Sequence, residues 1–171
     1  MFRFDQFVED WASKYKPMLH EPGRHSGNER FFLTDTYMGM ADFMVNVQPD
    51  KSPCVIMESD QEGSMTDRLD NPRYTLYFMV QAERMSDGRA AYDAKLEAKE
   101  HMRKFINWLR AKQEEEERKG GVTMVGNITI EEHINYQTVG PFYNGWYGVC
   151  ISLEDTQSYL RCVIQDDYLV D

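Results

Sequence analysis

The sequence predicts an α+β protein: a mainly antiparallel sheet with an N-terminal helix and one long helix packed on it. Three observations predict this class. Several short segments have apolar residues at every second position, two longer segments have them at helical spacing, and the connections between segments are short. The 171 residues, 42% of them hydrophobic and 13% aromatic, suffice for one domain over residues 1–171 with a substantial core.

The first predicted element is a helix over residues 4–16. Phe4, Phe7, Val8 and Trp11 have helical spacing, and Pro17 ends the pattern. The segment HEPGRHSGNER that follows is polar and contains glycine and proline, so it predicts a loop.

The next part of the chain predicts strands. Residues 31–47 are rich in aromatic residues, Met and Val, which favours one or two strands with a bend at Gly39. After the turn QPDKSP, the segment PCVIMES predicts a short buried strand. DQEGSMTDRLDNP predicts a polar loop, and RYTLYFMVQAE predicts a strand. The apolar face of that strand carries Tyr74, Leu76, Phe78 and Val80.

The strongest element is a helix over residues 87–119. Ser86 or Asp87 can cap its start, and Gly120 and Gly121 end it. Near its end lies the run Glu114, Glu115, Glu116 and Glu117, which is typical of a solvated helix terminus, although it could also bind a cation, a basic partner or another subunit. Its apolar stripe consists of Tyr92, Leu96, Met102, Phe105, Ile106 and Leu109.

Three antiparallel strands are predicted after the long helix: VTMVGNITIEEHINYQTV, NGWYGVCISL and SYLRCVIQ. Matching the apolar faces of the last two pairs residues 149–153 with residues 160–164, with Ile151 opposite Cys162. Cys150 then points to the opposite face from Cys162. We therefore expect no disulfide between them, which agrees with a reducing compartment.

The segment VGPFYNGWYGVCISL begins with an aromatic turn rich in glycine. Phe142, Tyr143 and Trp146 are expected to cap the core at the end of the sheet, because large aromatic side chains pack well there. The alternative is a patch between subunits, since Tyr and Trp are enriched at interfaces.

No motif in the sequence names a reaction. The most specific catalytic hypothesis is a metal-dependent nuclease in which Asp50 and Glu58 hold Mg²⁺. The position two residues after Glu58, where such a site needs a lysine, is Asp60. A Pro-Asp turn followed by a strand explains the same residues.

The histidines do not have the spacing of metal ligands. His20 and His25 are expected to be solvated loop residues, and His101 is expected on the flank of the long helix. His133 has no such partner nearby either. We therefore expect no catalytic residue, no metal site and no cofactor.

Charge and hydropathy restrict the partners. A net charge of −10 argues against a protein that tracks nucleic-acid phosphates. No apolar run reaches the ~18 residues of a membrane span. The acidic residues near the start do not suit a secretory signal, so the cytoplasm is the expected compartment.

In the order of its elements, the chain resembles small α+β proteins of bacteriophage tails: tail-terminator or tail-completion proteins and head–tail joining proteins. An N-terminal helix precedes PCVIM, the strand RYTLYFMVQAE leads into the long helix at Ser86–Lys119, and C-terminal strands follow from VGPFYNGWYGVCISL. The likeness covers residues 4–165 and rests on element order alone. It implies a ring-forming subunit of a phage or prophage, commonly hexameric, without cofactor or active site, in the host cytoplasm or the virion.

The sequence therefore favours a non-enzymatic structural or assembly protein that associates with itself and with other phage structural proteins. The first alternative is a small acidic binding module of the immunity-protein kind. It would present the loop 58–70 and the run 114–117 to a basic protein. The second alternative is a divergent nuclease built on Asp50 and Glu58.

Overall fold

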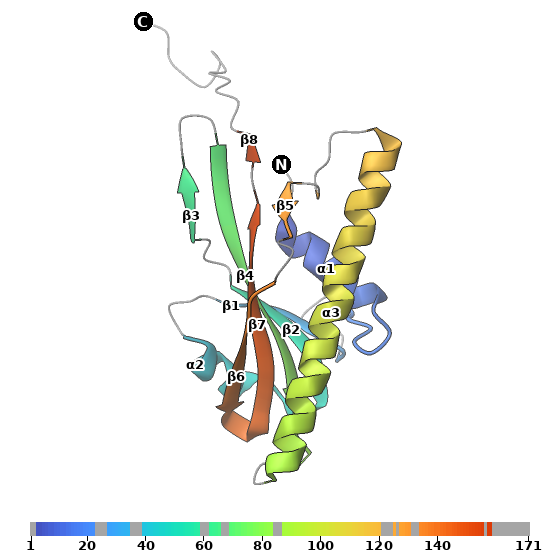
Figure 1. Ribbon diagram of the computed structural model, residues 1–171. Coiled ribbons are helices and arrows are strands. Elements are labelled where there is room, and N and C mark those ends of the chain that lie inside the picture. The colour runs from blue at the N-terminus through green and yellow to red at the C-terminus, as the bar shows by residue number, and fades with distance from the viewer. Residues whose placement is uncertain are drawn as a thin grey trace, which may run out of the picture.

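The computed structural model describes residues 3–22, 27–34, 39–58, 62–65, 69–83, 87–120, 125, 127–130, 134–155 and 157–158. The predicted α+β class is confirmed: helices pack on a sheet in which all but one strand pair is antiparallel (Figure 1). The helices are α1 (Phe4–Lys14), α2 (Gly39–Asn46) and α3 (Gly88–Lys119), with short 3-10 turns at Pro49–Lys51 and Tyr143–Gly145. The strands are β1 (Phe31–Thr34), β2 (Cys54–Glu58), β3 (Glu62–Met65), β4 (Leu69–Gln81), β5 (Ile128–Thr129), β6 (Tyr136–Phe142), β7 (Trp146–Asp155) and β8 (Gln157–Ser158).

The long strand β4 organises the sheet. One side of β4 pairs with β2 and β3, and its other side pairs with β7 and β8. The far side of β7 pairs with β6 and β5, while β1 lies parallel to β2 at the opposite margin. Among the described residues, the sheet therefore has β1 at one edge, and β6 with β5 at the other.

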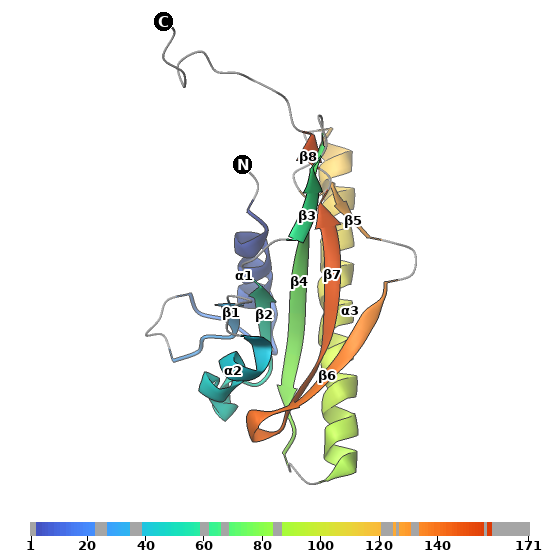
Figure 2. The same cartoon turned by 90° about the vertical axis from the view of Figure 1, so that its left-hand side faces the viewer.

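Helices α1 and α3 cover one face of the sheet and enclose what we call the main core (Figure 2). Phe105 of α3 lies at its centre, with its ring against those of Phe4, Trp11 and Phe78. The apolar faces predicted for the strands point into this core, including Val149, Ile151 and Leu153 of β7. The alternation of apolar residues in the sequence therefore predicted correctly which side chains of the strands face the main core.

Helix α2 covers part of the opposite face and encloses what we call the small core. Its fully buried members are Met44, Val47, Cys54, Ile56, Met79 and Trp146. The prediction that residues 39–47 form a strand is therefore wrong. The physical reason is visible in the spacing, because Met40, Phe43, Met44 and Val47 recur at helical intervals despite their strand-like composition.

The predicted polar loop before β4 is also partly wrong. Residues 62–65 form β3 and pair with residues 70–73 of β4, so the hairpin extends the sheet. A strand with few apolar residues has no alternation to mark it, and here backbone pairing with β4 decides its structure.

The long helix is confirmed at both ends. The Asp87 side chain accepts a hydrogen bond from the Arg89 N–H at 2.8 Å, and Gly120 ends the helix with a φ of +63°. Its predicted stripe is correct from Met102 onward but wrong for Tyr92 and Leu96, which are 62% and 49% exposed. In that half of α3 the buried positions are the small residues Ala94 and Ala98.

For the predicted pairing of residues 149–153 with residues 160–164, β7 is already paired on both sides at Val149 and Ile151, but only with β4 at Leu153 within the described part of the chain. Val149 pairs with Phe78 of β4 on one side and with Thr138 of β6 on the other, and Ile151 is flanked in the same way. Residues 159–171, including Cys162, lie outside the described residues. Cys54 and Cys150 are free thiols. None of the described helices is long and apolar enough to cross a membrane.

Candidate functional site

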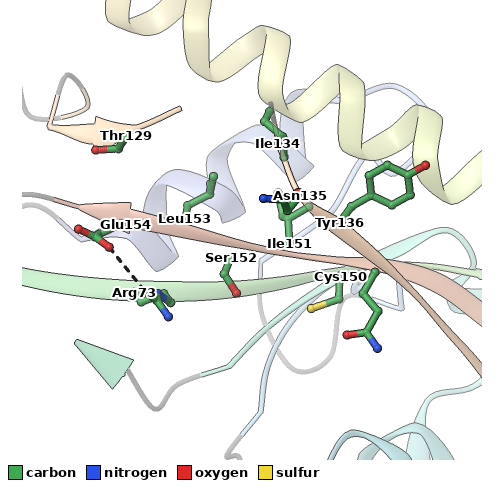
Figure 3. Close-up of a pocket in the computed structure, with 11 residues that line it drawn as sticks. Arg73, Thr129, Ile134, Asn135, Tyr136, Cys150, Ile151, Ser152, Leu153 and Glu154 are labelled. Carbon is green, nitrogen blue, oxygen red and sulfur yellow. Dashed lines mark ion pairs between the residues drawn. The ribbon is translucent and has the colours of Figure 1, made fainter. Parts of the chain in front are cut away.

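A groove of about 450 Å³ lies along β7, in the gap between β5 and β6 (Figure 3). β5 pairs with residues 154–155 of β7 and β6 with residues 146–151. Ser152 and Leu153 are therefore paired only with β4 within the described part of the chain. Polar side chains line much of the groove, among them Asn135, Gln137 and Ser152.

An ion pair and a thiol lie among the groups that line this groove. Arg73 and Glu154 are partly exposed and face each other at 3.6 Å. Burial raises the pKa of the Cys150 thiol to about 11, so the reactive thiolate is scarce at neutral pH. The groove therefore offers hydrogen bonds and one ion pair, which suits binding better than covalent chemistry.

The two carboxylates of the nuclease hypothesis are not brought together. Asp50 lies in the turn before β2, and Glu58 lies at the far end of that strand. The five residues of β2 extend over about 13 Å and so keep the two carboxylates apart. Asp50 lies beside Lys51 at 3.6 Å, whereas Glu58 accepts a hydrogen bond from the Tyr77 hydroxyl at 2.7 Å. Across the described ranges, no three His, Cys, Asp or Glu side chains are grouped to hold a metal ion. Asp60 lies outside those ranges.

His20 is buried, so the prediction of a solvated loop residue is wrong for it. Its Nδ1 accepts a hydrogen bond from the Arg30 N–H at 2.9 Å, and its Nε2 faces Glu9 at 3.3 Å. The ring thus joins α1 to the start of β1. The polar, glycine-containing composition of this segment does not predict such a long-range contact. His25 and His133 lie outside the described residues.

His101 is also buried, in contrast to the helix-flank position that we predicted. Its Nδ1 meets the Tyr15 hydroxyl at 2.9 Å and its Nε2 lies 3.4 Å from Glu97. Burial lowers the pKa of His101, although the carboxylates of Glu97 and Glu100 act in the opposite direction. The neutral ring therefore serves as a structural link between α1 and α3.

The aromatic turn divides between the core and the surface. Trp146 is fully buried in the small core and Phe142 packs against it, as the core-capping interpretation expects. Tyr143 is 59% exposed, so the core-capping prediction is wrong for this residue. The glycines permit the geometry: Gly140 has a φ of +95°, and at Gly148 a Cβ would lie 2.4 Å from the Phe78 carbonyl oxygen.

The acidic run of α3 takes part in contacts within the chain. Glu115 binds Lys112 at 2.8 Å and Lys119 at 2.6 Å, and these ammonium groups hold the pKa of Glu115 at about 2. Glu116 accepts a hydrogen bond from the Val125 N–H at 3.1 Å. Glu114 and Glu117 remain exposed.

A surface that sequence reasoning missed lies where α3 passes the β6 edge. We call it the edge surface, and it consists of β6 with Tyr92, Leu96, Lys95 and Lys99 of α3. The Lys99 ammonium lies 4.4 Å from the ring centroid of Tyr136 in β6, and Lys95 lies 5.3 Å from that of Tyr147. Tyr136 is itself 42% exposed.

The charge of α3 differs between its two sides. Lys95, Lys99, Arg103 and Arg110 recur at intervals of four, four and seven residues, which places them along the side that passes β6. Glu97, by contrast, lies against His101 on the side of α1. A basic strip on a chain of net charge −10 marks this side of α3 as unusual. The spacing of these cations was the signal that could have revealed it.

A second groove, of about 340 Å³, lies where β4 ends and α3 begins. Four carboxylates line it, those of Glu83, Asp87, Asp93 and Glu97, together with Arg89. Its acidic lining could attract a cationic side chain of another protein.

Comparison with known proteins adds no assignment. No protein-family model matches the chain, and no curated protein is significantly similar to it.

Proposed function

We propose that the chain is a non-enzymatic structural subunit that associates with copies of itself through the edge of its sheet. The observation that carries the proposal is the edge surface. β6 has the sequence YQTVGPF, without a single charged residue, and residues 136–138 are exposed. An uncharged edge strand is a template for another strand, and soluble proteins usually block such edges with charge.

The side chains beside this edge favour a protein partner. Tyr92 and Leu96 are exposed on α3, one helical turn apart, and Tyr136 is exposed on β6, where its ring lies against Lys99 of the same helix. Exposed aromatic and aliphatic side chains next to unpaired backbone can contribute apolar contact and hydrogen bonds together. This combination supports an interface.

The resemblance to phage tail proteins supplies the setting of the proposal. The helix α1, the strand β2, the passage from β4 into α3 and the hairpin of β6 and β7 follow the order on which that resemblance rests. On this resemblance, we propose that the subunit belongs to the tail end or to the head–tail junction of a phage or prophage. Assembly would take place in the host cytoplasm, with other phage structural proteins as partners and no cofactor.

The test is the mass of the protein by light scattering over a concentration series, with electron microscopy of any large species. Closed assemblies well above the monomer mass of 20.1 kDa are expected. Replacing Tyr92 and Leu96 with Ser should lower the association, whereas the same change at Glu114 and Glu117 should not. A monomer at every concentration and salt would contradict the proposal.

The acidic groove favours a second candidate, a binding module for a basic protein. A lysine oligopeptide can serve as the probe, at low and moderate salt. In this case, Asp93→Asn with Glu97→Gln would weaken binding, and the matched pair Glu114→Gln with Glu117→Gln would leave it unchanged. Equal loss in both pairs would mean that only net charge matters.

A further inference from the structure

We propose that two buried histidines make the N-terminal arm of the fold sensitive to acid, so that the arm opens away from the rest of the chain as the pH falls. The arm consists of α1 and the segment after it, residues 4–21, and it packs against α3 (Figure 1). His20 joins the arm to the start of β1, and His101 joins it to α3. Self-association is not needed for this behaviour.

The hydrogen bonds of His20 decide which of its ring nitrogens carries a proton. Nδ1 accepts from the N–H groups of Arg30 at 2.9 Å and Phe31 at 3.3 Å, and a backbone N–H can only donate. Nδ1 is therefore without a proton, and Nε2 carries the proton and donates to the Glu9 carboxylate at 3.3 Å. The closed arm thus uses the neutral ring of His20.

A second proton on His20 conflicts with these contacts. A proton on Nδ1 would point at two N–H donors, and because the ring is only 4% exposed, water cannot take their place. Among the described charged side chains, Glu9 faces the ring and favours the protonated form, whereas the Arg30 guanidinium binds the Asn28 side chain and the Ser52 carbonyl. Protonation of His20 therefore costs the closed arm two hydrogen bonds that the open arm does not have.

His101 has the same pattern of contacts. Its Nε2 lies 3.4 Å from Glu97, and its Nδ1 lies 2.9 Å from the hydroxyl of Tyr15, the residue that follows the last turn of α1. A carboxylate can only accept, so Nε2 carries the proton and the Tyr15 hydroxyl donates to Nδ1. The neutral ring of His101 therefore links α3 to the arm.

Burial makes the protonated form of His101 unfavourable while the arm is closed. It lowers the pKa of His101 and outweighs the carboxylates of Glu97 and Glu100, which act in the opposite direction. The arm contributes the Tyr15 hydroxyl, which stays uncharged because burial raises its pKa. When the arm is open, the His101 ring meets water and titrates at about 6.5. The open arm therefore binds more protons than the closed arm, so opening increases as the pH falls through about 6.5.

The arm is otherwise held mainly by apolar contacts. Val8, Trp11 and Met18 are buried in the main core. The Trp11 ring lies against those of Phe78 and Phe105, so opening of the arm uncovers aromatic side chains of the sheet and of α3. Acid therefore exposes apolar surface that the closed protein hides.

Hydrogen exchange of the full chain, followed by mass spectrometry between about pH 7.5 and pH 5.5, tests the proposal. Rates are corrected for intrinsic exchange at each pH. We expect the opening constant of α1 to rise at least ~10-fold, because one histidine that excludes its second proton in the closed arm contributes about that factor. The amides of β4, inside the sheet, should open less often than those of α1 at every pH.

Asn is the matched substitution for both histidines, because its side-chain oxygen can accept a hydrogen bond near the position of Nδ1 but binds no proton. His20→Asn and His101→Asn should each remove part of the rise, and together they should limit it to less than about twofold. Glu117→Gln, at an exposed position near the end of α3, is the control and should leave the rise unchanged. Each single variant decides the question by itself if the double variant does not fold.

Two results would overturn the proposal. Equal opening constants for α1 and β4 at every pH would mean that the arm opens only when the whole chain unfolds. A rise that remains undiminished in both single variants would assign the acid response to carboxylates rather than to His20 and His101.

Discussion

The two cores on opposite faces of the sheet are built in different ways. The main core joins elements with strong periodicity, α1, α3 and the strands, and aromatic rings meet at its centre. The small core lies beneath an eight-residue helix and an aromatic turn, and Met and Trp side chains fill most of it. Periodic elements therefore create the main core from local pattern, whereas the small core depends on how the chain closes over the sheet.

The small core is also less completely satisfied. The indole N–H of Trp146 is buried and has no hydrogen-bond acceptor within the described part of the chain. An unpaired buried donor lowers the stability of the fold, and the apolar contacts of the Trp146 ring in the small core must offset this cost. Trp146 is the first residue of β7, where it fills the space between α2 and the sheet.

The largest effect is expected from Phe105→Ala in the main core. Phe105 is fully buried and its ring contacts Phe4, Phe7, Trp11 and Phe78, so the substitution leaves a large cavity. We expect a loss of about 3–5 kcal/mol in the free energy of unfolding, measured with denaturant. Lys104→Ala, at an exposed position of the same helix, should change it by less than about 0.5 kcal/mol. Similar losses in both variants would contradict the burial described for α3.

The corresponding substitution in the small core is Met44→Ala. Met44 is the fully buried residue of α2, but its side chain is flexible and its neighbours can partly close the cavity. A loss of about 2–3 kcal/mol is expected, at the low end for buried Met. Val45→Ala in the same helix is the control, since Val45 is exposed. If Met44→Ala costs more than Phe105→Ala, the ranking of the two cores is wrong.

Gly148→Ala probes the close approach of β7 to β4. The added Cβ would lie 2.4 Å from both the Phe78 carbonyl oxygen and the Met79 sulfur, and the backbone cannot yield easily. We expect a loss of about 1–3 kcal/mol in unfolding experiments. Gly88→Ala, where nothing lies within 4 Å of the new atom, should be neutral or slightly stabilising. An unaffected Gly148→Ala variant would mean that the strands can separate.

The smallest effect is expected in the pH dependence of the free energy of unfolding that His101 contributes. His101 has a pKa that burial lowers in the folded state, whereas it titrates near 6.5 when unfolded. Below about pH 6.5 the unfolded chain binds more protons at this site, so its contribution to stability is present above that pH and is lost as the pH falls. His101→Gln should show a flatter decline than the wild type in unfolding measured between about pH 8 and pH 5. Parallel curves would show that His101 does not contribute.

Much of the fold followed from pattern. The long helix was predicted within one residue at its start, because Asp87 and Gly120 are strong terminal signals. Strands β2 and β7 and the main part of β4 followed from alternating or continuous apolar residues. Residues 39–46 were mistaken for a strand because β-prone composition outweighed helical spacing.

The candidate surface was predicted less well. Of the residues assigned to an interface, Trp146 lies in a core and Glu115 and Glu116 bind groups of their own chain. The basic strip of α3 could be read from its spacing. The open edge of β6 could not, because an edge exists only when the order of strands in the sheet is known.

Local sequence pattern was enough to predict most of the helices and strands, the start and end of α3, and the apolar faces of β4 and β7. These properties depend on neighbours within a few residues, so local pattern records them. The tertiary structure alone decided that His20 and His101 are buried, that α2 closes the small core, and that β6 forms an edge beside a basic helix side. Those properties arise from residues far apart in the chain, which only packing brings together.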